Sequence, residues 1–225
     1  MNTPTDGDTC HIYLVRHGAT DANQQQPYIL QGRGIDKPLN REGQRQAQAV
    51  GRFLTRYPLA GVYASPLVRA VQTAQAIAAP HGLGVAAIAD LCECHVGQWE
   101  GMNWDAIMRE FPDAYHAFIA NPAEVPYLGG ESYADVLSRA KPVLHELAQQ
   151  HRGESIAVVA HNVVNRVFVA SLLGLDLCKA KELRQANCCV NVIRFEADVA
   201  TLVTMNADFH LHEPEANRAE LPHVA

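Results

Sequence analysis

The chain has 225 residues, of which 48% are hydrophobic and 19% charged, and its net charge is −6. This composition is typical of a globular protein with one sizeable core. Because the chain is acidic and has no cluster of lysine and arginine, we expect no nucleic-acid partner. The longest apolar runs, at 156–160 and 167–173, are too short to cross a bilayer, so no membrane partner is expected.

The first residues, 1–10, are polar and lack the basic start and apolar core of a signal peptide, so they predict a flexible N-terminal lead. The apolar run Ile12–Val15 predicts a buried strand at 11–16. A segment rich in Gln, Gly and Asn follows at 19–40, and this composition is typical of a long loop.

Strands and helices alternate from there on. Asn40 is a suitable N-cap for a helix at 41–57, which Pro58 would end. The elements expected next are a strand at 61–65, a helix at 66–80, a strand at 85–89, and an irregular segment at 91–130 with short helices near 103–111 and 114–120.

The last part of the chain continues the alternation. The expected elements are a helix at 131–151, a strand at 155–160, a helix at 163–173, and two strands at 189–195 and 199–205 joined as a hairpin. This order predicts an α/β fold: a single-domain three-layer sandwich with a mostly parallel central sheet flanked by helices and an antiparallel hairpin near the C-terminus. No repeat or linker indicates a second domain.

The six cysteines show no CxxC spacing and suggest no disulfide framework. Reduced thiols in a cytoplasmic protein are the simplest interpretation. Cys92, Cys94 and His95 offer a weak zinc site at most, because two ligands one residue apart lack a second pair. We expect no metal.

Two predicted strands end in a histidine. His17 follows Arg16 at the end of the first strand, and His161 follows the strand at 155–160. Because parallel strands bring their carboxyl ends to one edge of the sheet, the two imidazoles are expected to meet there. A histidine that only caps a strand is the alternative for His17.

The same edge offers charged partners for these imidazoles. Arg69 lies in the first turn of a helix, where free N–H groups favour anions, and Glu93 follows the strand at 85–89. Two arginines and two imidazoles would suit a dianionic tetrahedral group, since guanidinium pairs with phosphate oxygens in a bidentate manner. A histidine beside phosphate could act as the nucleophile, and a carboxylic acid could protonate the leaving alkoxide. The alternatives are surface ion pairs for the arginines and solvent exposure for Glu93.

These residues resemble the histidine phosphatase superfamily, in its phosphoglycerate-mutase-like branch. The resemblance extends over several blocks that occur in order: Leu14–Thr20 with Asn23, Gly32-Arg33 with Asp36 and Pro38-Leu39, Gly43 with Gln46-Ala47, Ser65–Leu67 with Arg69-Ala70 and Gln72–Ala74, Leu91 with Glu93, Gly97 with Trp99–Gly101, Gly129–Ser132, and Val158–His161.

The resemblance implies that His17 is the phosphorylated nucleophile and Glu93 the proton donor. It implies Arg16, Arg69 and His161 as phosphate ligands assisted by Asn23, with no metal and no organic cofactor. Gly18 would keep the approach to His17 open, and Arg33 and Asn162 are further candidates for phosphate binding. Asn162 stands where the family usually has glycine, and the spacing from Gly32 to Asp36 is one residue longer than usual.

The domain implied by this resemblance covers 11–210, with 91–130 as an insertion that covers the substrate and 211–225 as a C-terminal tail. The loops at 24–38 and 95–130 would recognise the alcohol part of the substrate. Candidate side chains in these loops are Tyr28, Arg33, Lys37, Trp99, Trp104, Arg109, Tyr115, His116 and Tyr127.

The function favoured by these observations is hydrolysis of a small phosphorylated metabolite. The segment 97–101 lacks the tyrosine-glycine element usual in the mutases of this family, which favours a phosphomonoesterase. A cofactor-dependent phosphoglycerate mutase is the alternative, and a non-catalytic binder of phosphorylated ligands is a second one. A homodimer is possible through the final strands or the helices at 163–185.

Overall fold

The computed structural model describes residues 8–197 and 199–212. Within them lies one sheet with the strand order β3-β2-β4-β1-β5-β6. Its strands are β1 (Thr9–Arg16), β2 (Leu59–Ala64), β3 (Val85–Ala87), β4 (Ser155–Ala160), β5 (Val190–Glu196) and β6 (Val199–Ala207). The strands β3, β2, β4 and β1 run parallel to one another, while β5 pairs antiparallel with both β1 and β6. The mostly parallel sheet and the C-terminal hairpin are therefore confirmed.

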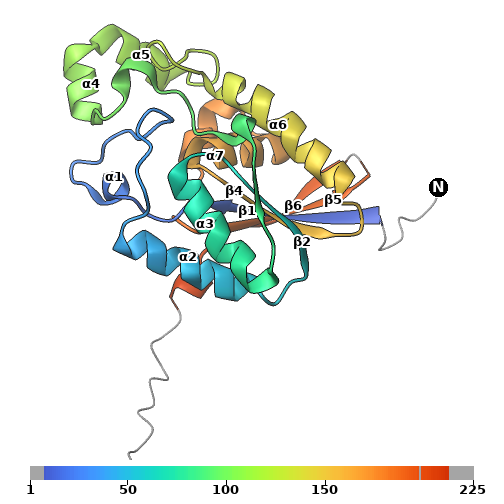
Figure 1. Cartoon of the computed structure of the whole chain (residues 1–225). Helices are drawn as coiled ribbons and strands as arrows, with labels where there is room; N and C mark the ends of the chain where they lie inside the picture. Colours follow the sequence, from blue (N-terminus) through green and yellow to red (C-terminus); the bar gives the residue numbers. More distant parts are fainter. Residues whose placement is uncertain (1–7, 198, 213–225) are drawn as a thin grey trace, which may run out of the picture.

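Helices cover both faces of this sheet (Figure 1). Side chains alternate between the faces along β1, so that Ile12 and Leu14 pack with α6 (Tyr133–Gln150) and α7 (Asn162–Leu172). Tyr13 and Val15 pack on the other face with α2 (Arg41–Leu54) and α3 (Val68–Ala78). The result is the predicted three-layer arrangement.

The remaining helices lie beyond the carboxyl ends of the parallel strands. They are α1 (Asp21–Gln24), α4 (Trp104–Glu110) and α5 (Pro112–Ala120), and Figure 1 shows α4 and α5 side by side at this end of the molecule. The fully buried indole of Trp99 joins this segment to the core through edge-to-face contacts with Trp104, Phe118 and Tyr127. Across the described residues, no helix has the length and apolar character that a bilayer span requires.

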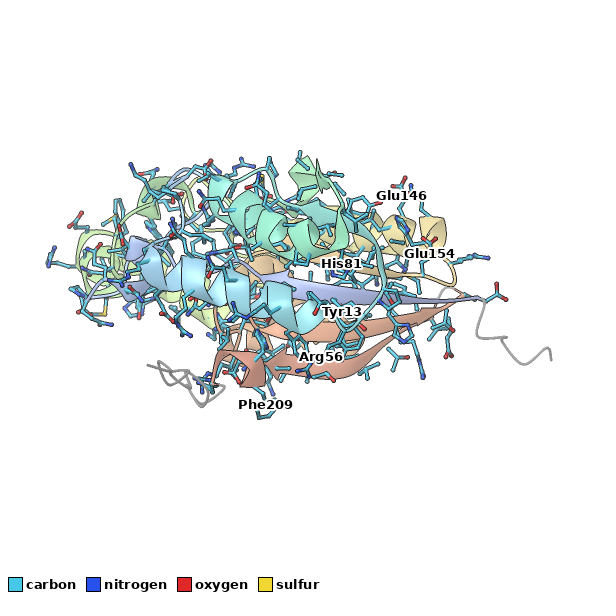
Figure 2. All side chains as sticks on the ribbon, turned by 60° about the horizontal axis from the view of Figure 1, so that its bottom comes forward. Tyr13, Arg56, His81, Glu146, Glu154 and Phe209 are labelled. Carbon is cyan, nitrogen blue, oxygen red and sulfur yellow. The ribbon has the colours of Figure 1, made fainter. Side chains whose placement is uncertain are left out.

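Two sequence predictions at the ends of the domain need correction. A flexible lead over residues 1–10 is wrong for Thr9 and Cys10, which pair with Glu196 and Phe195 of β5 and bury Cys10 completely. Residues 1–7 lie outside the described residues, as do residues 213–225 of the predicted tail at 211–225. Leu211 belongs to a 3₁₀ turn at Phe209–Leu211, from which Phe209 projects at the surface (Figure 2).

Several element boundaries also differ from the prediction. The segment 19–40 is not entirely loop, because α1 forms one helical turn that Thr20 and Asn23 stabilise as a capping box. Asn40 caps α2 as expected by accepting from the Gly43 N–H, but α2 ends at Leu54, three residues before the predicted end. The third helix begins at Val68 because Leu67 is still extended.

The first turn of α2 lies very close to the loop that follows β1. A Cβ atom on Gly18 would lie 2.5 Å from the carbonyl oxygen of Gly43, and a Cβ atom on Gly43 would collide with the carbonyl oxygen of Ala19. Both glycines are therefore needed for close backbone approach. This contact fixes the chain on the carboxyl side of His17.

We predict that Gly43→Ala destabilises the fold by about 1–3 kcal/mol, because the added methyl group must displace the backbone of Ala19. Denaturant unfolding measures this change. Gly84→Ala is the matched control, since a Cβ atom there meets nothing within 4 Å, and its free energy of unfolding should stay close to that of the unchanged chain. Equal stability of the two variants would contradict the close approach.

Candidate functional site

His17 stands directly after β1 and is almost completely buried, with 3% of its surface exposed. Its Nδ1 lies 2.7 Å from the carbonyl oxygen of Gly18. A carbonyl oxygen can only accept, so Nδ1 carries the hydrogen and the neutral ring keeps a lone pair on Nε2. Burial lowers the pKa of His17 well below its usual value of 6.5, and the charges of Arg69 and Arg16 lower it further. The side chain therefore presents an unprotonated, nucleophilic nitrogen.

His161 lies beside His17, with ring centroids 5.1 Å apart. The two histidines meet because β1 and β4 are neighbours in register, with the His17 N–H donating to the carbonyl of Ala160 at 3.0 Å. Burial lowers the pKa of His161 as well, followed by the charges of Arg69 and neighbouring groups. Arg16, His17, Arg69 and His161 thus form one unit, which we call the cation–histidine cluster.

Several polar atoms of this cluster are buried without a hydrogen-bond partner. They are both ring nitrogens of His161 and the Nε atoms of Arg16 and Arg69. Leaving such groups unpaired in a protein interior costs free energy. An anion with several acceptor oxygens would satisfy the donors among them and balance the arginine charges.

Arg69 is completely buried in the first turn of α3. Its guanidinium donates to the carbonyl oxygens of Gly32 at 2.9 Å and Ile35 at 3.0 Å. The loop that supplies these carbonyls is in turn held by the carboxylate of Glu100, which accepts from the N–H groups of Gly32, Gly34 and Ile35. The sequence placed Glu100 in a motif but gave no sign of this role.

The backbone around His17 is held on both sides. The Gly18 N–H donates to the hydroxyl of Thr73 at 3.0 Å, and the side chain of Asn187 donates to the His17 carbonyl at 3.0 Å. The Gly18 N–H is therefore engaged within the protein, and the glycine is required by the packing against α2. Sequence reasoning missed Asn187, which lies far along the chain in a segment without any recognisable pattern.

Glu93 follows a 3₁₀ turn at Ala89–Leu91 and is 4% exposed. Its carboxylate accepts from the Cys94 N–H at 2.9 Å and, with both oxygens at 3.3 Å, from the N–H of Val163 in the first turn of α7. Arg139 of α6 fixes the same turn by donating to the carbonyls of Asp90, Cys92 and Glu93. The carboxyl group is therefore held in one position.

A cavity of about 310 Å³ opens beside the cluster. Its walls include five of the predicted site residues, namely Arg16, His17, Asn23, Glu93 and Asn162. Glu93 supplies the one carboxyl group among the described residues that line it. The other lining residues are Tyr28, Leu30, Gln31, Val96, Trp104, Phe118, Ile119, Tyr127, Tyr133, Val163, Arg166 and Lys181.

The remaining predicted residues lie outside the cavity wall. Arg69 and His161 are completely buried next to His17, and Gly18 lies in the backbone contact with α2. The side chain of Arg33 is exposed and does not line the cavity. Asn162, the position without the usual glycine, keeps a buried side-chain oxygen that has no hydrogen-bond partner.

Among the predicted recognition residues, Tyr28, Trp104 and Tyr127 line the cavity, whereas Trp99 belongs to the core and Arg109 pairs with Glu110 at the surface. Arg166 and Lys181 were missed, because they come from elements outside the two loops considered. In the part of the chain that the structure describes, no group of three or more metal-ligating side chains comes together.

Comparisons with known proteins identify the family of this chain. Residues 12–208 match the histidine phosphatase superfamily (branch 1). The chain is 33% identical over 210 residues to phosphoserine phosphatase 1 of Hydrogenobacter thermophilus, covering 92% of this chain and 98% of the relative. It is 37% identical over 171 residues to a metal-independent phosphoserine phosphatase of Arabidopsis thaliana, covering 72% and 68% of the two chains. The crystal structure of an Entamoeba histolytica phosphoserine phosphatase in complex with 3-phosphoglyceric acid superposes with a TM-score of 0.80 at 25% identity, over 90% of this chain and 99% of that one.

We predict that the imidazole of His17 stays neutral, with its hydrogen on Nδ1, as the pH falls through 6.5, the usual pKa of histidine, because burial and two arginines lower its pKa. The unfolded chain takes up protons below about pH 6.5 that the folded chain excludes, so the free energy of unfolding should fall in this range. Nitrogen chemical shifts of the ring in the absence of phosphate measure the first effect. A titration of His17 near 6.5 would contradict the assignment.

Proposed function

Because the chain belongs to the histidine phosphatase superfamily, we propose that it is a metal-independent phosphomonoesterase that hydrolyses a small phosphorylated metabolite. The observation that carries the mechanism is the orientation of the His17 ring: Nδ1 is bound to the Gly18 carbonyl, which leaves the lone pair of Nε2 free, and the arginines beside it have buried Nε atoms without a hydrogen-bond partner. A nucleophile beside an anion site is the arrangement that phosphoryl transfer requires.

In the first step, Nε2 of His17 attacks the phosphorus atom. The N–P bond forms as the bond from phosphorus to the alcohol oxygen breaks, and Glu93 donates a proton to the leaving oxygen. Arg16, Arg69 and His161 hold the phosphoryl oxygens and stabilise the charge that develops on them. Positioning and electrostatics thus supply most of the rate acceleration.

In the second step, water attacks phosphorus and transfers a proton to the Glu93 carboxylate. The N–P bond breaks, its electron pair returns to Nε2, and inorganic phosphate leaves. The same carboxyl group serves as acid and then as base, and Glu93 suits both roles because its position is fixed by Val163 and by the Arg139-bound turn. The segment at 91–130 would cover the substrate, since its aromatic side chains form one wall of the cavity.

The cavity of about 310 Å³ has room for a phosphate group and a small alcohol part. The relatives that are phosphoserine phosphatases favour a phosphomonoester of the size of phosphoserine. A panel of phosphorylated metabolites, with phosphate release as the measurement, identifies the preferred member.

We predict that the protein hydrolyses p-nitrophenyl phosphate in excess EDTA and that His17→Ala lowers kcat/KM by about 10³-fold or more, because the nucleophile is lost. Steady-state phosphate release measures this. Activity that survived His17→Ala would contradict the role of His17. Phosphate binding without hydrolysis in the unchanged chain would point to a non-catalytic binder, and faster transfer between phosphoglycerates than release of phosphate would point to a mutase.

We predict that the effect of Glu93→Gln depends on the leaving group. For an alkyl phosphate, kcat/KM should fall by about 10²–10⁴-fold, because the alkoxide must be protonated as it leaves. For p-nitrophenyl phosphate the loss should be much smaller, since nitrophenolate leaves without a proton. Equal losses for the two substrates would show that Glu93 does not act as the proton donor.

A further inference from the structure

Two of the cations that line the cavity have no role in the proposed phosphoryl transfer. They are Arg166 of α7 and Lys181 of the 3₁₀ helix Leu177–Glu182. We propose that Arg166 and Lys181 form a carboxylate subsite, so that the preferred substrates are small phosphomonoesters that also carry a carboxylate. This inference rests on the proposed phosphomonoesterase function and specifies the substrate class.

The positions of the two residues suit the far end of a small substrate. Arg166 lies about one turn of α7 beyond His161, on the helix whose first turn also holds Glu93. Lys181 lies where its 3₁₀ helix meets α5, and its ammonium donates to the carbonyl of Ile119 at 2.9 Å. A substrate whose phosphate reaches Nε2 of His17 must direct its other end toward the remaining walls of the same cavity.

Among the described residues, no carboxylate neutralises either cation. The Nε of Arg166 donates to the carbonyl of Leu183 at 2.6 Å, which orients the guanidinium but adds no negative charge. Lys181 is likewise bound to a carbonyl, and within the described ranges neither residue forms an ion pair. Both side chains are half-buried, so water compensates their charges only in part.

The balance of charge in the cavity also favours a second anionic group. Among the described lining residues, the cations are Arg16, Arg166 and Lys181, and the single carboxyl is Glu93. Arg16 is assigned to phosphate with Arg69, which leaves Arg166 and Lys181 unmatched. Burial lowers the pKa of Arg16, and repulsion from Arg166 contributes in the same direction, so the field of Arg166 reaches the phosphate site. A carboxylate between Arg166 and Lys181 would relieve this repulsion.

The hydrogen bonds to backbone carbonyls do not by themselves explain why positions 166 and 181 hold an arginine and a lysine. An uncharged donor could make either contact to a backbone carbonyl, whereas a planar guanidinium and an ammonium are suited to bind a carboxylate. The proposed ligand is therefore a carboxylate on the substrate, with the phosphate held by the cation–histidine cluster.

Pairs of substrates that differ in the carboxylate test this proposal. Phosphoserine is compared with phosphoethanolamine, and 3-phosphoglycerate with glycerol 3-phosphate, with p-nitrophenyl phosphate as the common reference. The unchanged chain should prefer the carboxylated member of each pair. Arg166→Met and Lys181→Met should each reduce that preference by roughly 10- to 100-fold, mainly through a higher KM, because a hydrogen-bonded charge pair is lost.

A matched control lies on the same 3₁₀ helix. Lys179 is exposed and does not line the cavity, so Lys179→Met should leave both the preference and the activity as in the unchanged chain. Lys181→Arg keeps the charge and should retain the preference. Arg166→Met also removes the contact to the Leu183 carbonyl, and thermal unfolding shows whether the variant still folds. If it does not, the substrate preference of Lys181→Met tests the subsite by itself.

The results separate the two proposals. Hydrolysis of p-nitrophenyl phosphate without a preference for carboxylated substrates, or a preference that survives Lys181→Met, would overturn the subsite and leave the phosphomonoesterase intact. Failure to hydrolyse any of the five substrates would overturn the proposed function and the subsite with it.

Discussion

The buried charge of Arg69 is the constraint on which the site depends. The guanidinium is completely buried and is held by the carbonyls of Gly32 and Ile35, while its carboxylate neighbour, Asp36, is 3.9 Å away and partly exposed. Carbonyl oxygens orient a cation without neutralising it. The positive charge of Arg69 therefore remains available to an anion. The same charge lowers the pKa of His17 and so keeps the nucleophile unprotonated.

The sheet brings the other members of the cluster to this cation. Parallel pairing of β1 with β4 places His17 beside His161, and α7 then begins at Asn162, with the Val163 N–H of its first turn donating to Glu93. Supporting contacts come from elements far apart in the sequence: the Glu100 carboxylate shapes the loop under Arg69, and Arg139 fixes the turn that carries Glu93. The reactive groups are thus positioned by hydrogen bonds from several elements of the fold.

Much of this could be predicted from the sequence because it follows from strand ends and helix starts. His17, His161 and Arg69 come together as expected. The apolar runs in the sequence reveal where the strands end, and residues that follow parallel strands lie at the same edge of the sheet. The role of Glu100 could not be predicted, because it depends on three backbone N–H groups in an irregular loop. Arg166 and Lys181 were missed because they enter the cavity from elements whose packing is set by tertiary contacts.

The central claim is that the neutral Nε2 of His17 takes up the phosphoryl group during turnover. Rapid acid-free quenching of the enzyme with phosphoserine, followed by peptide mapping under alkaline conditions that preserve phosphohistidine, tests it most directly. The account predicts one phosphorylated peptide, which carries the group on Nε2 of His17 and forms and decays at least as fast as turnover. A phosphoryl group on another residue, or rapid hydrolysis without any phosphoenzyme and with inversion at phosphorus, would contradict it.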